Sequence, residues 1–178
     1  MNVIVRVTFE LGQDRKVAAI RIQCLVHWLF FIFGEIMQIN KIYNLLNKSI
    51  EKCKKSKDVP VVSLLYKDEY NFYLGFNTRQ KKYEINNHAE INCINKAFKK
   101  TRSKNMSEYK LYVNLKPCLM CITTLEQVNI KEVYYWLEND KIDYSRIRSS
   151  IIFSKVYNKR QEEFFRNELQ NFFKILRG

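Results

Sequence analysis

Two short motifs restrict the fold of this chain more than any other feature of its sequence. They are His88-Ala89-Glu90 and Pro117-Cys118-Leu119-Met120-Cys121. Each lies where the sequence pattern predicts the beginning of a helix, directly after a loop or a strand. Histidine and cysteine side chains bind metal ions, and residues so far apart in the chain form one site only if they meet in space. A fold that uses both motifs must therefore bring the beginnings of two helices together.

The residue types of the two motifs are those of a hydrolytic zinc site. Such a site takes three protein ligands and leaves the fourth tetrahedral position for water. His88, Cys118 and Cys121 are the three candidate ligands. The partial positive charge of a helix N-terminus lowers the pKa of a cysteine and so favours the thiolate that binds metal. Glu90, in the first turn of its helix, would take a proton from the metal-bound water and pass it to a leaving amine.

Other interpretations of the cysteine pair exist. Cys-x-x-Cys alone is also typical of a redox pair or of half a structural zinc site. A structural site would need a fourth cysteine or histidine nearby, and Cys93 is the one candidate. Because Cys93 lies three positions after Glu90, it is expected to point elsewhere on the helix. The two motifs together favour a catalytic centre.

The apolar periodicity predicts both helices and strands. Helices are predicted over residues 39–53, 88–100, 118–128 and 161–177, and strands over 59–66, 70–76, 111–115, 132–137 and 151–157. Residues 67–69 are predicted to form a turn and residues 77–87 a loop. In the last helix the residues predicted to face inward are Phe164, Phe165, Leu169, Phe172, Phe173 and Leu176. The sum is an α/β sandwich of about five strands with helices on the sheet faces.

The N-terminal part of the chain contains an apolar stretch at residues 24–33. This stretch is about half as long as the roughly 20 residues that span a bilayer. A packed helix is therefore expected there in preference to a signal peptide or a transmembrane anchor, and no stable membrane association is expected. Residues 1–36 are interpreted as an N-terminal extension, with Met37 as an alternative start, and residues 37–178 as the catalytic domain.

The chain is strongly basic. Its 178 residues include 31 Lys and Arg against 18 Asp and Glu, which gives a net charge of +13. A charge of this size favours polyanionic partners, with nucleic acid ahead of an anionic membrane. A lysine-rich solvated surface is the alternative interpretation. The five cysteines are odd in number and irregularly spaced. No disulfide framework is expected, and a reducing compartment such as the cytoplasm is favoured.

The H-x-E and P-C-x-x-C motifs together resemble those of the cytidine and deoxycytidylate deaminase superfamily. Over residues 39–177 the chain looks most like the bacterial tRNA adenosine deaminases, which convert the wobble adenosine of an anticodon to inosine. The segments that carry this resemblance are Val59-Pro60-Val61-Val62, Gly75-Phe76-Asn77, His88-Ala89-Glu90-Ile91, Leu111 to Cys121, and Phe172-Phe173 with Arg177. The resemblance implies a three-layer α/β/α sandwich, Zn²⁺ as cofactor, the tRNA anticodon loop as partner and a homodimer.

The resemblance also implies substrate contacts. They fall on Asn77, Ala89, Pro117 and Asn139, with Asp140 as the alternative to Asn139 for the ribose contact. Basic residues of the 77–82 loop and of the C-terminal helix would hold phosphates.

The chain departs from the family pattern at three places. Lys116 stands where the family usually has glutamate, Ile122-Thr123-Thr124 replace small residues, and Trp136 to Asp140 replace a Gly-Ala-Arg-Asp segment. These departures concern the substrate and leave the zinc ligands intact. A deoxycytidylate, cytidine or guanine deaminase with the same zinc site is the alternative enzyme. A zinc-bound RNA-binding subunit without activity is the alternative outside catalysis, and the presence of Glu90 argues against it.

Overall fold

The structure is a computed structural model that describes the backbone of residues 15–177 and the side chains of residue 34 and residues 36–177. The chain divides into two compact units, residues 1–40 and 41–178. Helix α1 (Arg15–Ser56) begins in the first unit and ends in the second, and it includes the predicted helix at 39–53. The expectation for residues 1–36 falls partly on residues 1–14, which lie outside the described residues. Among the helices described, none has the length and apolar content needed to cross a membrane.

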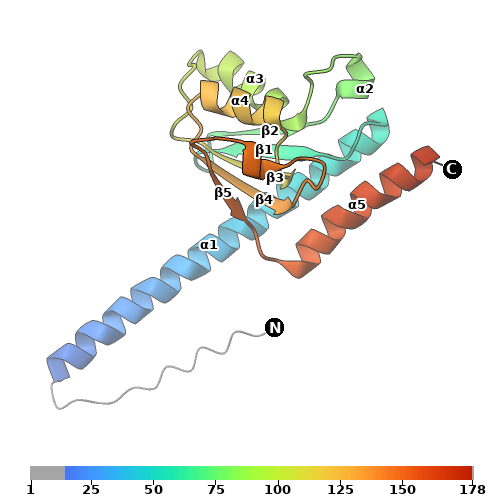
Figure 1. Cartoon of the computed structure of the whole chain (residues 1–178). Helices are drawn as coiled ribbons and strands as arrows, with labels where there is room; N and C mark the ends of the chain where they lie inside the picture. Colours follow the sequence, from blue (N-terminus) through green and yellow to red (C-terminus); the bar gives the residue numbers. More distant parts are fainter. Residues whose placement is uncertain (1–14, 178) are drawn as a thin grey trace. The chain divides into compact units, whose positions relative to one another are not determined.

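The second unit contains a five-stranded sheet in the order β2-β1-β3-β4-β5 (Figure 1). The strands are β1 (Val62–Tyr66), β2 (Phe72–Phe76), β3 (Lys110–Leu115), β4 (Glu132–Leu137) and β5 (Ile152–Lys155). Strand β1 is antiparallel to both of its neighbours, β2 and β3, whereas β3, β4 and β5 are parallel to one another. Strands β2 and β3 therefore run in the same direction, and their carboxyl ends lie at one edge of the sheet.

Helices cover both faces of this sheet, which confirms the predicted three-layer α/β/α architecture. The helices are α2 (Arg79–Lys82), α3 (Ala89–Thr101), α4 (Leu119–Gln127) and α5 (Lys159–Arg177), with a 3-10 turn η1 (Tyr144–Arg146). Helices α3 and α4 lie on one face, and α5 lies on the other with the end of α1 (Figure 1). Tyr43 of α1 packs its ring edge-on against Phe165 of α5, with the ring centroids 5.4 Å apart.

The predicted element types are confirmed, and side-chain hydrogen bonds account for the later starts of β1 and β2. Strand β1 begins at Val62, later than predicted, because the Asn114 side chain takes the place of backbone-to-backbone hydrogen bonds before that residue. Its Nδ2 donates to Pro60 O at 2.9 Å and its Oδ1 accepts from Val62 N–H at 2.9 Å. Strand β2 begins at Phe72 because the Asp68 carboxylate accepts from the backbone N–H of Asn71 at 2.8 Å and so closes the turn.

Two short elements and one side-chain orientation differ from prediction. Helix α2 lies inside the predicted loop at 77–87, and η1 lies where no element was predicted; both are too short to show a periodic pattern. Leu176, predicted to face inward, is 66% exposed, whereas Phe165 is fully buried. The prediction for Leu176 is wrong because the last turn of α5 extends past the part of the helix that covers the sheet.

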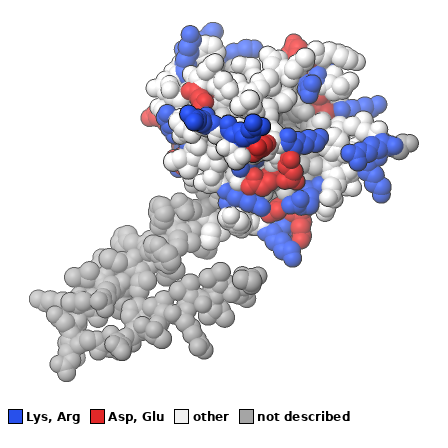
Figure 2. All heavy atoms as spheres, in the orientation of Figure 1, with Lys and Arg blue, Asp and Glu red and all other residues white. Residues whose placement is uncertain are grey.

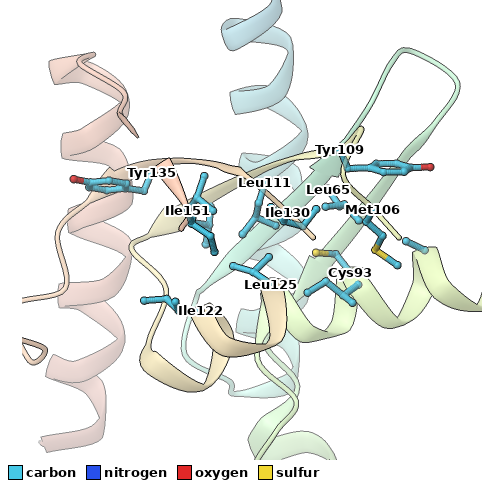
Figure 3. Close-up of a cluster of buried hydrophobic side chains, with 14 residues drawn as sticks. Leu65, Cys93, Met106, Tyr109, Leu111, Ile122, Leu125, Ile130, Tyr135 and Ile151 are labelled. Carbon is cyan, nitrogen blue, oxygen red and sulfur yellow. The ribbon is translucent and has the colours of Figure 1, made fainter. Parts of the chain in front are cut away.

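The main hydrophobic core lies between the sheet and helices α3 and α4. Figure 3 shows Leu125 of α4 and Cys93 of α3 among apolar side chains of the sheet and its loops, including Leu65, Leu111 and Ile130. All five of these side chains are fully buried. Burying apolar area of this kind stabilises the fold by roughly 25 cal/mol per Å². This core fixes α3 and α4 against the same face of the sheet.

Gly75 of β2 allows helix α3 to lie unusually close to the sheet. A Cβ atom at this position would lie 2.0 Å from Ala89 O and 2.8 Å from Cys93 N, both backbone atoms of α3. Backbone atoms cannot move aside as the end of a flexible side chain can. The absence of a side chain at Gly75 therefore sets the distance between β2 and the beginning of α3.

We predict that Gly75→Ala lowers the free energy of unfolding by about 1–3 kcal/mol, because α3 must shift to accommodate the methyl group. Denaturant unfolding measures this change. Gly34→Ala is the control, because nothing lies within 4 Å of a Cβ at Gly34. Alanine is also favoured over glycine inside a helix by about 1 kcal/mol. Equal stabilities of the two variants would contradict the prediction.

Candidate metal centre

The side chains of His88, Cys118 and Cys121 meet at the beginnings of α3 and α4. His88 Nδ1 lies 3.6 Å from Cys118 Sγ and 3.5 Å from Cys121 Sγ, and the two sulfurs are 3.7 Å apart. His88 and Cys118 are the N-cap residues of their helices, yet neither side chain forms a capping hydrogen bond. Both side chains are therefore directed at one another, and the three atoms together could hold a metal ion.

The strand directions explain why two motifs far apart in sequence meet. Strands β2, β3 and β4 run the same way, so the loops that follow them all leave the same edge of the sheet. His88 follows β2 after a loop, Cys118 follows β3 almost directly, and Asn139 follows β4. Ligand sites in α/β folds lie at such carboxyl edges for this reason.

The hydrogen bond between the two cysteines of the centre shifts their pKa values in opposite directions. Hydrogen bonding with Cys121 lowers the pKa of Cys118 to about 4, and hydrogen bonding with Cys118 raises the pKa of Cys121. Hydrogen bonding with Cys118 also raises the pKa of His88. A lowered thiol pKa favours the thiolate, which is the state in which sulfur ligates metal.

Glu90 is buried beside the three candidate ligands. The residue is 3% exposed, and its Oε2 has no hydrogen-bond partner among the described residues. Burial raises the pKa of this carboxyl to about 7. A group with a pKa near neutrality both accepts and donates protons readily at physiological pH. An unpartnered buried oxygen of this kind also indicates a place that a reactant or water fills.

A cavity of about 760 Å³ opens onto the centre. Its lining includes His88, Glu90 and Cys118, and on the opposite side Phe172 and Phe173 of α5. This volume lies in the range of sites that enclose a small organic ligand, roughly 300–1,000 Å³. The cavity therefore has room for a nucleoside next to the candidate metal ligands.

The residues predicted to contact substrate lie at different places around this cavity. Asn77, Ala89 and Asn139 line it, whereas Asp140 is not among the lining residues, which favours Asn139 of the two alternatives. The Asn77 amide is partly engaged, because its Nδ2 donates to Val59 O at 3.3 Å. Pro117 is buried and lies outside the lining, and its carbonyl accepts a hydrogen bond from Tyr144.

Asp58 and Tyr83 are among the cavity residues that the sequence did not single out. Asp58 is 1% exposed, and its carboxylate accepts from the backbone N–H of Gln80 at 2.5 Å and from Ser56 Oγ at 2.6 Å. It thereby ties α2 to the cavity wall. Tyr83, 87% exposed, lies on the rim with a left-handed backbone at φ 56°. Both belong to polar segments with no periodic pattern, so neither carried a sequence signal.

Cys93 takes no part in the centre. Its thiol donates to Glu90 O at 3.0 Å and lies 3.3 Å from Ser63 Oγ, and burial raises its pKa to about 12. The prediction that Cys93 points elsewhere on the helix is confirmed. Within the described residues the three-ligand group stands without a fourth protein ligand. Such a set leaves one coordination position open, as catalytic sites do.

Comparison with known proteins also points to a zinc-binding centre in this part of the chain. Residues 37–137 match the family model described as the cytidine and deoxycytidylate deaminase zinc-binding region. The chain is 31% identical over 96 residues to the tRNA-specific adenosine deaminase of Rickettsia bellii, a match that covers 53% of this chain and 66% of that protein. It is 30% identical over 130 residues to the enzyme of the same name from Rickettsia felis, covering 67% of this chain and 90% of that protein.

Solved structures show the same fold. A tRNA:A34 deaminase studied for A-to-I editing superposes with a TM-score of 0.60 at 18% identity, covering 67% of this chain and 99% of that one. A guanine deaminase from Nitrosomonas europaea gives a TM-score of 0.57 at 12% identity, covering 71% of this chain and 81% of that one. At these identities the likeness concerns the fold, which is shared by enzymes with different substrates.

We predict that Cys118→Ser lowers the affinity for a divalent metal by more than roughly 10- to 100-fold. A loss of that size follows removal of a residue that only hydrogen-bonds to a metal ligand, and Cys118 is itself a candidate ligand. Competition with a chromogenic chelator measures this affinity. Cys93→Ser is the matched control, because serine keeps a donor for Glu90 O and Cys93 lies outside the centre. The assignment fails if both variants bind metal as tightly as the original chain.

Proposed function

The chain belongs to the cytidine and deoxycytidylate deaminase family, and from this premise we propose that it is a zinc-dependent tRNA adenosine deaminase that acts at the wobble position of the anticodon. The observation that carries the catalytic part of the proposal is the meeting of His88, Cys118 and Cys121 beside Glu90, whose buried Oε2 has no hydrogen-bond partner among the described residues. The relatives named tRNA-specific adenosine deaminase support the substrate part.

The spacing of the three candidate ligands fits zinc. Bonds of about 2.3 Å to sulfur and about 2.0–2.1 Å to nitrogen, at a tetrahedral angle, separate two sulfurs by about 3.8 Å and a sulfur from a nitrogen by about 3.6 Å. The two sulfurs lie 3.7 Å apart, and His88 Nδ1 lies 3.6 Å and 3.5 Å from them. Two thiolates and an imidazole are also a donor set that zinc accepts. We therefore assign His88, Cys118 and Cys121 as the zinc ligands.

The reaction follows from the position of Glu90. Zinc in this centre would supply Lewis acidity, which makes water a better proton donor near neutral pH. Glu90 takes a proton from the attacking water, which adds to C6 of adenine, and then gives a proton to the departing amine. Adenosine and water thus become inosine and ammonia. Because its pKa is about 7, Glu90 suits both proton transfers.

The remaining cavity residues would bind the base and its ribose. Asn77 and Asn139 are both among the residues that line the cavity. Ala89 and Phe172 offer apolar surface on which a purine packs. We assign Asn77 to the base and Asn139 to the ribose. Pro117 acts on the substrate indirectly, through the geometry of Cys118.

The charge of the chain supports an RNA substrate. The net charge of +13 exceeds what a small uncharged nucleoside requires for recognition. Figure 2 shows Lys and Arg side chains over the visible face, with a group at the C-terminal end of α5, where Lys174 and Arg177 lie. The apolar part of α5 lines the cavity, so this group would meet phosphates of the bound strand. An anticodon loop offers an unpaired adenosine that enters such a cavity at modest cost.

The proposal extends to the organisation of the protein. We assign residues 37–178 to the deaminase domain; the family match from residue 37 and the compact unit from residue 41 support this boundary. A homodimer with tRNA as partner is proposed from the resemblance to the tRNA deaminases. The cytoplasm is proposed as its compartment, since the described cysteines Cys53, Cys93, Cys118 and Cys121 are all free thiols.

We predict that Glu90→Gln lowers kcat by roughly 10²- to 10⁴-fold while zinc content and tRNA affinity stay unchanged, because the amide keeps the shape of the side chain and loses the proton transfer. Steady-state deamination kinetics, metal analysis and a filter-binding assay measure these three quantities. Loss of zinc together with activity would place Glu90 among the ligands, and undiminished turnover would remove it from the reaction.

We predict deamination of a tRNA transcript with adenosine at the wobble position and no turnover of the same transcript with guanosine there. The logarithm of the tRNA binding constant should fall linearly with the logarithm of salt concentration, as phosphate contacts require. Inosine is detected by sequencing of the product RNA.

Free deoxycytidylate, cytidine and guanine are the comparison substrates. Turnover of a free substrate alone would identify the enzyme as a nucleotide, nucleoside or base deaminase with the same zinc site. Binding of tRNA without turnover of any substrate would identify an RNA-binding subunit.

A further inference from the structure

Lys116 directly precedes the Pro117-Cys118 segment, and its ammonium group is enclosed by aromatic rings. Its Nζ lies 4.1 Å from the ring centroid of Tyr144, 4.8 Å from that of Tyr135 and 5.7 Å from that of Phe153. Glu138 completes the enclosure with a carboxylate oxygen 3.1 Å from Nζ. The Lys116 side chain is only 14% exposed. A partly desolvated cation over aromatic faces is held more strongly than a surface lysine.

Tyr144 connects this enclosure to the metal centre. Its hydroxyl donates to Pro117 O at 2.7 Å and also lies 3.2 Å from Lys116 O. The Pro117 carbonyl belongs to the peptide group whose nitrogen is that of Cys118. A hydrogen bond to this carbonyl therefore sets the orientation of the peptide plane from which the Cys118 side chain departs.

Both ends of this connection are anchored. Lys116 N–H donates to Leu137 O at 2.9 Å, which is the last link between this segment and strand β4. Tyr144 begins the short turn η1, where the Asp143 carboxylate accepts from the N–H of Ser145 at 3.1 Å and from its hydroxyl at 2.6 Å. The Tyr144 ring is held in addition by the ammonium of Lys116. The hydroxyl is thus presented to Pro117 from a fixed position.

We propose that Tyr144 and Lys116 are positioning residues for the metal ligand Cys118. The Tyr144 hydroxyl holds the Pro117–Cys118 peptide so that the Cys118 sulfur stays within reach of His88 and Cys121, and the Lys116 ammonium holds the Tyr144 ring. This inference rests on the proposed zinc site. Catalytic centres need their ligands held to about 0.5 Å, and outer partners that do so change metal affinity or activity by about 10- to 100-fold when removed.

The experiment is the substitution Tyr144→Phe, which removes the hydroxyl and keeps the ring over Lys116. We expect the zinc dissociation constant, from chelator competition, to rise by about 10-fold or more. The visible absorption spectrum of Co²⁺ bound in place of zinc should change, since it reports the ligand geometry. At saturating zinc, kcat should fall while KM for tRNA stays near its original value.

Tyr134→Phe is the matched control. Tyr134 lies in the same strand as Tyr135, and its hydroxyl donates to Glu132 at 2.7 Å, away from the Pro117-Cys118 segment. The control removes the same atom from the same residue type, so it reports any general effect on the sheet. We expect its zinc affinity and its Co²⁺ spectrum to equal those of the original chain.

A second pair of variants tests the role of Lys116. Lys116→Arg keeps a cation that stacks on aromatic rings, and Lys116→Met keeps the chain length without the charge. We expect Lys116→Arg to retain the zinc affinity of the original chain. We expect Lys116→Met to bind zinc more weakly, as Tyr144→Phe does. This pair also tests the proposal if Tyr144→Phe fails to fold.

The outcomes separate this inference from the proposed function. If the original chain binds no zinc, the proposed zinc site fails. If it binds zinc and Tyr144→Phe matches Tyr134→Phe in affinity and spectrum, the zinc site stands and the positioning role is overturned. Equal behaviour of Lys116→Met and Lys116→Arg would overturn the role of the ammonium.

Discussion

The convergence of two helix N-termini at one edge of the sheet is the constraint on which the rest of the structure depends. Strands β2 and β3 run in the same direction although β1 lies between them, so the helices that follow both strands begin at the same edge. Gly75 then lets the beginning of α3 approach the sheet to a distance that a side chain would prevent. His88, Cys118 and Cys121 meet as a result of these two facts, and the cavity opens where they meet.

A buried carboxylate oxygen without a partner normally lowers stability. Glu90 is held in that state by the packing of α3 against the sheet, since neighbouring residues of the helix such as Cys93 and Ala97 are fully buried. Proteins retain unfavourable groups of this kind mainly at functional sites, where the group gains its partner from a ligand. The same burial that destabilises the charged carboxyl moves its pKa toward neutrality, which is the property that proton transfer uses.

The lysines of this chain play different parts. Exposed pairs such as Lys41 with Glu69 and Lys67 with Glu108 lie on the surface, where ion pairs contribute about 0–1 kcal/mol. Lys and Arg outnumber Asp and Glu in the chain, and this excess of basic residues gives the protein a long-range positive field. Lys116 is enclosed and contacts both a carboxylate and aromatic rings. Under the two proposals above, one residue type would attract a polyanion at the surface and would hold an aromatic ring in place near the metal centre.

The sequence by itself determined the fold class and the identity of the candidate metal ligands. The apolar periodicity of 88–100 indicates a helix, and the short run at 132–137, rich in Val, Tyr and Trp, is typical of a strand. The two motifs indicate the candidate ligands by residue type and order. Only the tertiary structure decided what surrounds those ligands. Asp58, Tyr83 and Tyr144 lie in short polar segments, and their roles come from contacts between distant parts of the chain. Local pattern reports propensity along the chain, whereas the presence of Asn139 and the absence of Asp140 among the residues that line the cavity depend on how distant segments pack.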